Sequence, residues 1–291
     1  MSRVKRGTIK NKKSINVPNV YLKLPSLTPK DVAYIHFAAK NNVDFIIHSF
    51  VRNVQDLNDI KTIFAEHPEY KGKILSKIEN REGFDNIESI LENSDGIMVA
   101  RGDLMSEVPM EELPYMQKKM VDASIRKSKY CIVATQVLKS MVNNPSPTRA
   151  EVCDIGNAVL DGTTAISMSD ETAYGSYPVE ATSVMNRVMR YTELKRDELH
   201  HFSAKPESTD ATYTFAKEVV SAADAAGVKA IVTVSADINL NKALGSYHPK
   251  APVLAGTTSL EDFRDMMMGY ALRPVHVSSL ATKEIVAGSG L

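Results

Sequence analysis

The sequence predicts an α/β protein built on parallel sheets, and three observations support this prediction. Short apolar runs alternate with amphipathic helical patterns, which is typical of βαβ units. The apolar runs are almost continuously hydrophobic, as strands are when helices cover a parallel sheet. The chain has 291 residues, 43% hydrophobic and 24% charged, an ordinary globular composition that suggests about two domains at roughly 150 residues each.

Five strands are predicted before residue 200, and each is followed by a helix. The strands are 43–50, 73–79, 95–103, 130–136 and 164–169. The helices are 54–67, 84–93, 112–128, 149–162 and 178–199. The first helix has Leu57, Ile60, Ile63 and Phe64 on one face at helical spacing. This series predicts a parallel sheet of five βα units.

A second α/β series follows a polar stretch at 200–211, which contains a proline and is interpreted as a linker. Its predicted helices are 211–227, 238–247 and 259–270, and its predicted strands are 228–235, 251–256 and 273–278. The segment 284–288 is compatible with one more short strand. We therefore predict two domains, 1–200 and 201–291.

Charge and cysteine content exclude several classes of function. Lys plus Arg and Asp plus Glu both number 35, so nothing indicates nucleic acid as an electrostatic partner. The basic residues within 1–13 are not followed by an apolar region, which favours a solvated basic face over a functional tail or a signal peptide. No apolar run approaches the ~18 residues of a membrane span. Cys131 and Cys153 are expected to be buried thiols in a reducing cytoplasm, without a disulfide or a zinc site.

Charged residues stand at the ends of the most hydrophobic predicted strands. Lys77 and Glu79 are two residues apart on one strand, so their side chains point to the same side, and Asp103 ends the next strand. Ligands of parallel α/β proteins bind at these carboxyl ends. Two carboxylates suit Mg²⁺, and a lysine beside them suits a phosphate-bearing substrate. A surface salt bridge is favoured for one such residue alone, but burying all three without a function is costly.

Polar residues also end the next two strands. Thr135 and Gln136 follow the fourth strand, and Ser169, Asp170 and Glu171 follow the fifth. Their hydroxyls and carboxylates suit substrate binding or proton transfer. They are equally ordinary at helix N-termini, so each signal alone is weak. Arg149, in a proline-rich loop that enters a helix, is compatible with packing or with substrate binding.

Successive motifs of this sequence resemble those of pyruvate kinases, in the same order and at the same spacing. They are "VDFIIHSFVR", "SKIEN", "SDGIMVARGDL", "ATQ", "NPSPTRAEVCDIGNAVLDGTTA" and "SDETAYGSYPVEA". The resemblance runs from about residue 7 to residue 190, and the part after residue 205 is similar to that family's C-terminal domain. It implies a partial TIM (β/α)8-type barrel of about five units, followed by a shortened α/β domain.

The resemblance implies phosphoryl transfer from phosphoenolpyruvate to ADP, giving pyruvate and ATP in glycolysis. Glu79 and Asp103 would hold Mg²⁺ or Mn²⁺, and Lys77 would stabilise the phosphoryl group during transfer. Thr135 and the segment Ala100, Arg101, Gly102 and Asp103 would bind the substrate. Ser169 and Glu171 would lie on the path that delivers a proton to the enolate.

The chain also departs from the family pattern. Five units are present where the barrel has eight, so the first three strands, the K⁺ ligands and much of the nucleotide site are expected to be missing. Met105 stands where the family has glycine, and it would be strained if that position needs a positive φ. Asp170 stands in place of another glycine and adds a negative charge near the expected nucleotide phosphates.

Three hypotheses remain open from the sequence. The chain is a pyruvate kinase part that works with a complementing polypeptide or as a homo-oligomer. Alternatively, it is a non-catalytic relic or pseudoenzyme that acts as a binding subunit. The third hypothesis, another Mg²⁺-dependent enzyme of phosphoenolpyruvate or oxo-acids, is disfavoured by the density of ordered motifs.

Overall fold

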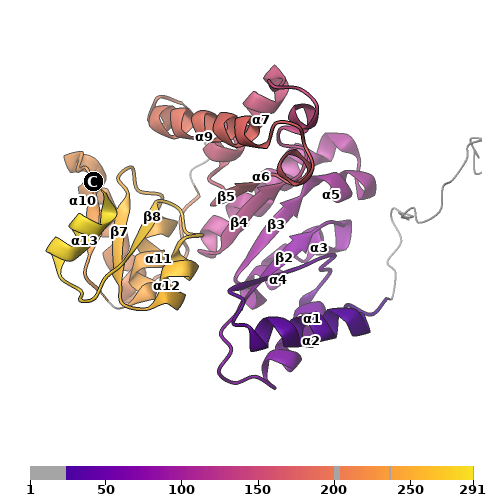
Figure 1. Cartoon of the computed structure of the whole chain (residues 1–291), viewed down its shortest axis with the longest axis horizontal. Coiled ribbons are helices and arrows are strands. Elements are labelled where there is room, and N and C mark those ends of the chain that lie inside the picture. Colours follow the sequence, from indigo (N-terminus) through magenta and orange to yellow (C-terminus); the bar gives the residue numbers. More distant parts are fainter. Residues whose placement is uncertain (1–23, 200–203, 236, 291) are drawn as a thin grey trace, which may run out of the picture.

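The computed structural model describes residues 24–199, 204–235 and 237–290 (Figure 1). The basic segment within 1–13 therefore lies outside the described residues. The predicted alternation of strands and helices is confirmed. The first five strands are β1 (Phe45–His48), β2 (Lys73–Ile78), β3 (Gly96–Ala100), β4 (Tyr130–Ala134) and β5 (Ala165–Ser167).

The helices of this part also follow the predicted order, with three additions and one predicted helix divided in two. They are α1 (Pro29–Lys40), α2 (Val54–Phe64), α3 (Arg81–Asp85), α4 (Ile87–Asn93), α5 (Arg101–Glu107), α6 (Leu113–Arg126), α7 (Arg149–Asp161), α8 (Asp170–Ala173) and α9 (Pro178–Lys195). Helices α1, α5 and α8 were not predicted, and the predicted helix 84–93 is divided into α3 and α4. Thr28 and Asp31 form a capping box that begins α1, and Pro29 occupies its first position.

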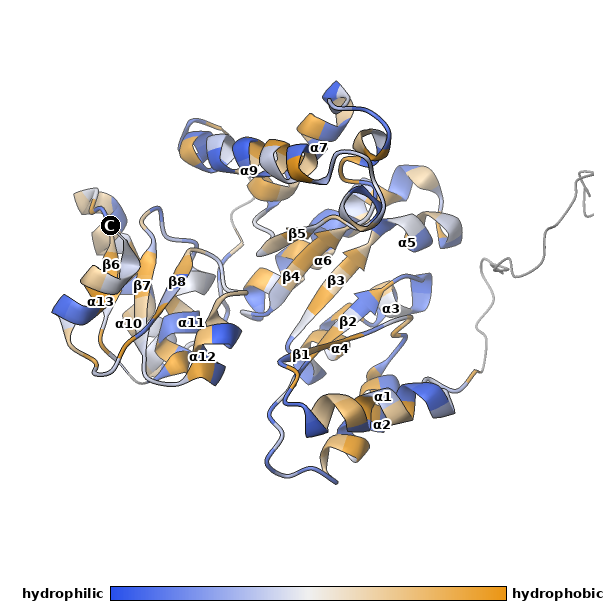
Figure 2. Cartoon of the chain, viewed as in Figure 1, coloured by the Kyte–Doolittle hydropathy of each residue, from blue (hydrophilic) through white to orange (hydrophobic). Residues whose placement is uncertain are grey.

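The five strands form one parallel sheet in the order β1-β2-β3-β4-β5, each pairing with the next strand along the chain. One face packs against the helices. Alternate strand residues such as Ile74, Ile97 and Val133 join Leu57 of α2 and Met116 of α6 in the main hydrophobic cluster. Figure 2 shows that these strands are coloured mainly as hydrophobic residues.

The opposite face of the sheet is also apolar but is only partly covered. Leu75 and Ile132 are buried there, and Phe45 and Met98 pack beside them. Ile47 of β1 is 43% exposed, although it lies in the middle of a strand. Within the described residues, β1 pairs only with β2, and β5 pairs only with β4. The sheet therefore has the sequential parallel order of a βα barrel with two open edges.

The second part of the chain forms a smaller three-layer α/β unit. Its parallel sheet has the order β6-β7-β8, with β6 at Ile231–Thr233, β7 at Val253–Thr257 and β8 at Leu272–His276. Helices α10 (Ala211–Ala226) and α11 (Ile238–Ser246) contribute to the cluster on one face, and α13 (Thr282–Ser289) places Ile285 against the other. Helix α12 is Leu260–Met266. The suggested strand at 284–288 is wrong, because these residues lie in α13.

The two parts meet at the beginnings of the barrel strands, opposite the candidate site. Asp265 of α12 is the centre of this contact. The Tyr130 hydroxyl of β4 donates to its Oδ1 at 2.8 Å, and Lys242 of α11 bonds its Oδ2 at 2.6 Å. Lys73 Nζ of β2 lies 3.9 Å from the same oxygen. The boundary at 200/201 stays a prediction; the described part of the proposed linker, residues 204–210, has no helix or strand.

Both cysteines are free thiols, as predicted, and Cys131 is buried. The expectation that Cys153 is buried is wrong, because its position on α7 faces outward. Among the described residues, no helix is both long enough and apolar enough to cross a membrane.

Candidate functional site

The end of β2 holds a buried ion pair. Lys77 Nζ lies 2.8 Å from Glu79 Oε1, and the Glu79 side chain is only 1% exposed. The other carboxylate oxygen, Oε2, accepts a hydrogen bond from the Phe50 backbone N–H at 2.7 Å. Lys77 also donates to the Ser49 hydroxyl at 3.3 Å. The ends of β1 and β2 are thus joined by side chains that the strand period places on one face.

Electrostatics at this point favour a bound cation. Burial raises the pKa of the Glu79 carboxyl, although hydrogen bonds from Lys77 and the Phe50 amide oppose that shift. The negative charge of Asp103, which lies in the first turn of α5 and not in the strand as predicted, raises the pKa of Glu79 further. Asp103 itself is exposed. Two carboxylates that repel each other, one of them desolvated, are stabilised by a divalent cation between them.

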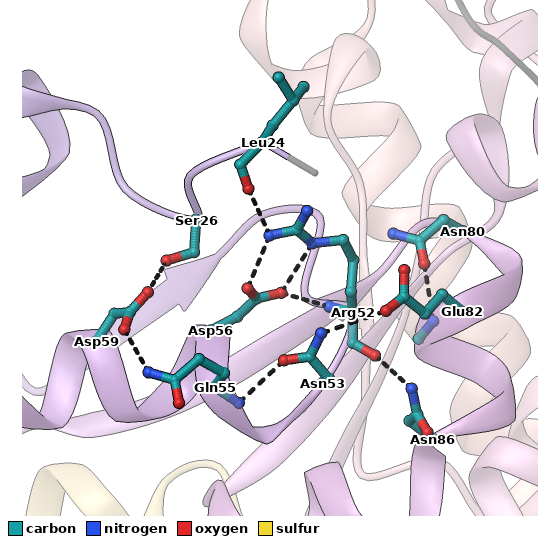
Figure 3. A network of polar contacts seen from close by, with 11 residues as sticks. Leu24, Ser26, Arg52, Asn53, Gln55, Asp56, Asp59, Asn80, Glu82 and Asn86 are labelled. Carbon is teal, nitrogen blue, oxygen red and sulfur yellow. Dashed lines mark hydrogen bonds and ion pairs between the residues drawn. The ribbon is translucent and has the colours of Figure 1, made fainter. Parts of the chain in front are cut away.

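The loop after β1 is fixed by a polar network around Arg52, drawn in Figure 3. The Arg52 guanidinium bonds both carboxylate oxygens of Asp56, at 2.8 and 3.1 Å, and the Leu24 carbonyl at 2.9 Å. The Asn86 side chain donates to the Arg52 carbonyl at 2.9 Å. This network orders the backbone immediately after Phe50, which has a positive φ of 54°. Arg52 therefore supports the amide that binds Glu79.

The ends of β3 and β4 are joined by Thr135. Its hydroxyl oxygen accepts a hydrogen bond from the Gly102 backbone N–H at 2.8 Å. Thr135 has a φ of 70° and Gln136 a φ of 53°, both in the left-handed region. Met105 lies in α5 and is not among the residues with positive φ, so it carries no such strain.

Arg101 follows β3 directly, but its side chain is buried. Its guanidinium donates to the Thr135 carbonyl at 2.8 Å and to both carboxylate oxygens of Asp154 at 2.7 Å. Arg101 therefore joins the ends of β3 and β4 to helix α7.

The end of β5 is organised by Glu171, which is 1% exposed. Its Oε1 accepts from the Leu138 N–H at 2.9 Å, and its Oε2 accepts from the Ser169 N–H at 3.0 Å. The carboxylate thus joins the loops after β4 and β5. Ser169 is exposed, and no hydrogen bond to its hydroxyl is recorded within the described ranges.

Asp170 does not present a free negative charge. Its carboxylate forms an ion pair with Lys139, from the loop after β4. This hydrogen bond lowers the pKa of Asp170, and a further one from Tyr174 lowers it too. Lys139 therefore offsets the charge that the sequence suggested would face the nucleotide.

The carboxylates fit a magnesium-type site. The described part of the chain has no group of three or more His, Cys, Asp or Glu side chains arranged to hold a metal. However, Mg²⁺ is typically held by one or two carboxylates, with water and substrate oxygens completing its shell. Glu79 and Asp103 meet that requirement, with Lys77 beside them to balance a phosphate.

Sequence reasoning missed several residues that shape the site. Ser49 and Phe50 follow β1 as the other site residues follow their strands, so strand-end position could have identified them. Asp154 lies inside a helical pattern, and nothing in the sequence marks it as the partner of Arg101. Arg149 is exposed at the first position of α7.

The ends of adjacent parallel strands thus carry a lysine, carboxylates and hydroxyl groups, at the edge where ligands of βα-barrel proteins bind. The pyruvate kinase barrel-domain model matches residues 2–182. The chain is 43% identical over 272 residues to a pyruvate kinase of Borreliella burgdorferi, covering 91% of this chain and 56% of that relative. The chain is 44% identical over 255 residues to the Bacillus licheniformis pyruvate kinase, covering 87% of this chain and 44% of that relative.

A third relative, the pyruvate kinase of Clostridium acetobutylicum, is 38% identical over 291 residues, covering 97% of this chain and 60% of that protein. The chain belongs to the pyruvate kinase family. The predicted fold class, a partial barrel followed by a smaller α/β domain, is confirmed. The chain spans about half the length of the curated relatives it matches.

Proposed function

We propose that this chain carries the metal- and lysine-binding part of a pyruvate kinase active site. The reaction breaks the bond between phosphorus and the enol oxygen of phosphoenolpyruvate and forms a bond to a terminal oxygen of ADP. The resulting enolate gains a proton at carbon to become pyruvate. Mg²⁺ or Mn²⁺, held by Glu79 and Asp103, would neutralise phosphate charge.

The observation that carries this proposal is the Lys77–Glu79 pair beside Asp103. Lys77 is one-quarter exposed and attached to a rigid strand, so its ammonium group can follow the phosphoryl group with little reorganisation. Glu79 would share its carboxylate with the metal, which would leave the Lys77 ammonium group more available to the phosphate. Catalysis of phosphoryl transfer rests largely on such positioning and charge.

The remaining site residues have supporting roles. Thr135 and the backbone from Ala100 to Asp103 bind the substrate at the β3 and β4 ends. Ser169 is exposed at the β5 end and lies on the proposed proton path. Glu171 has both oxygens occupied by backbone amides, so we propose that it acts by holding Ser169 in place.

A complete site requires more than these five units. A closed barrel of this type has eight βα units. The open edges at β1 and β5, and the exposed Ile47 of β1 on the inner face, suit three further units from a complementing polypeptide. The residues that hold K⁺ are expected in that part. Assembly as a homo-oligomer is the other proposed arrangement.

The same open face supports a second candidate function. A relic that no longer catalyses could use the apolar inner face and the β1 edge to bind a kinase subunit. In that case the Lys77–Glu79 pair would be a structural remnant, and its replacement would leave binding unchanged.

The test is pyruvate formation from phosphoenolpyruvate and ADP with Mg²⁺ and K⁺, by the chain alone and with a polypeptide that supplies three βα units. Lys77→Ala is compared with Lys73→Ala, which changes a lysine on the same face of β2 at its opposite end. We expect Lys77→Ala to reduce turnover by at least about 10²-fold and Lys73→Ala to retain it. If the two substitutions reduced turnover equally, the hypothesis of a non-catalytic binding subunit would be favoured. The same would follow if neither the folded chain alone nor the folded chain with the added polypeptide made pyruvate.

A further inference from the structure

Thr135 has a backbone conformation that its own side chain disfavours. Its φ of 70° lies in the left-handed region, which is rarely adopted by β-branched residues. Such conformations persist only when the surrounding structure determines them, and they concentrate at functional sites. Thr135 ends β4, next to the strand ends that carry Lys77 and Asp103. The question is which contacts impose this conformation.

Two neighbouring residues hold Thr135 at both its backbone and its side chain. The Arg101 guanidinium donates to the Thr135 carbonyl at 2.8 Å, with a longer 3.4 Å contact to the Ala134 carbonyl. The Gly102 N–H donates to the Thr135 hydroxyl oxygen at 2.8 Å. A Cβ added to Gly102 would lie 3.3 Å from that oxygen, so the approach is close.

Asp154 determines where the Arg101 guanidinium lies. The Arg101 side chain is 9% exposed, and one of its terminal nitrogens is within 2.7 Å of both Asp154 oxygens. The other described contact of that nitrogen, to the Gln117 side chain, is 3.4 Å long. A buried cation without a carboxylate partner would be driven to turn toward water. The hydrogen bonds to Ala134 and Thr135 would then be lost.

We propose that the Arg101–Asp154 ion pair is a positioning device for Thr135. It holds Thr135 in the left-handed conformation, in which the hydroxyl oxygen accepts from Gly102 and its hydrogen remains available. That hydrogen is donated to an anionic oxygen of the bound substrate. The proposal rests on the proposed function, since it assumes a substrate at the ends of β3 and β4. Asp154 and Arg101 act through Thr135 and are positioning residues.

The first readout does not depend on activity. Amide hydrogen exchange at Gly102 reports the bond to the Thr135 hydroxyl in the whole folded chain. We expect Asp154→Asn to speed this exchange by about tenfold, a change that corresponds to about 1.4 kcal/mol. The control is Asp122→Asn, which removes the 2.9 Å Asp122–Arg126 pair on α6 and should leave Gly102 exchange unchanged.

A double-mutant cycle separates positioning from general stability. Thr135→Ala removes the acceptor of the Gly102 amide, so its exchange should increase by itself. If Asp154 acts through Thr135, adding Asp154→Asn to Thr135→Ala should cause no further increase. Additive effects in this cycle would overturn the proposal. So would an Asp154→Asn variant in which all sheet amides exchange faster to the same degree as Gly102.

The second readout is the kinetics of pyruvate formation. Loss of a substrate contact made equally in the ground and transition states raises KM and leaves kcat nearly constant. We expect Asp154→Asn to raise KM for phosphoenolpyruvate about tenfold, and Asp154→Glu to restore part of the loss. An unchanged KM in an active enzyme would overturn the proposal. If wild-type protein makes no pyruvate either alone or with a polypeptide that supplies three βα units, the proposed function fails, while the exchange cycle still decides whether Asp154 positions Thr135.

Discussion

Replacing Glu171 with glutamine should destabilise the chain measurably, because the buried Glu171 carboxylate accepts hydrogen bonds from two backbone N–H groups. Oε1 accepts from Leu138 and Oε2 from Ser169, and the side chain is 1% exposed. The glutamine amide keeps one oxygen but presents an NH2 group to the other amide. One buried N–H then lacks an acceptor, which costs about 1–3 kcal/mol.

We expect the Glu171→Gln variant to lose about 2 kcal/mol of unfolding free energy, the middle of that range. Urea unfolding followed by circular dichroism measures this loss as a lower midpoint with an unchanged slope. The control is Glu180→Gln, an exposed carboxylate in the first turn of α9. A Glu171→Gln midpoint equal to that of the control would refute the view that the carboxylate joins the β4 and β5 ends.

Four further predictions concern other contacts. Because burial raises the pKa of Glu79 above its usual 4.5, the folded chain binds that proton more tightly than the unfolded chain. Its contribution to stability therefore falls as pH rises through this range, and Glu79→Gln should flatten the dependence of the urea midpoint on pH. Mn²⁺ should raise the melting temperature of the wild-type chain more at pH 7.5 than at pH 5. It should not raise the melting temperature of the Glu79→Gln variant at either pH. Tyr130→Phe should speed proteolysis at 204–210, since the lost buried bond to Asp265 is worth about 1.5–3 kcal/mol. Asp170→Asn removes an exposed pair with Lys139 and should leave the urea midpoint unchanged.

The strand ends were predictable because each carries two independent signals. A continuous apolar run marks the strand, and a polar residue at its carboxyl end marks the ligand-binding edge. Period-two geometry correctly places Lys77 and Glu79 on one face, where they form an ion pair. These signals are local, so they can be recognised in the sequence without knowledge of the tertiary packing.

The unpredicted helices α1 and α5 have weaker patterns than the predicted helices. In α1, Tyr34 and Phe37 are exposed while Ile35 is buried, so the apolar residues do not form a single stripe. Its capping box and Pro29 were nevertheless available as signals. Helix α5 is only Arg101–Glu107 and begins directly after β3. No loop separates the two elements, so the sequence reads as one longer strand.

The segment 284–288 shows tertiary contacts overriding propensity. Ile285 and Val286 are β-branched and favour a strand, but the segment is helical and buries Ile285 completely. A Cβ on Gly256 of β7 would lie 2.2 Å from the Ile285 side chain, so the helix packs directly on the sheet at a glycine. Likewise, nothing in the sequence identifies Thr135 as left-handed, because its conformation is imposed by Arg101, more than thirty positions away.

The sequential strand order has a consequence for folding. Because every strand of the first sheet pairs only with the preceding and following strands, each pairing joins two neighbouring βα units. Each pairing therefore closes the loop of a single crossover, and no pairing requires a longer loop to be closed. Each βα unit can therefore add to an existing edge much as a repeat adds to a solenoid. A break in the chain between two units removes the connection across one strand pair only. The units on either side of the break can then assemble separately, and each group ends in an edge strand that can pair with the other.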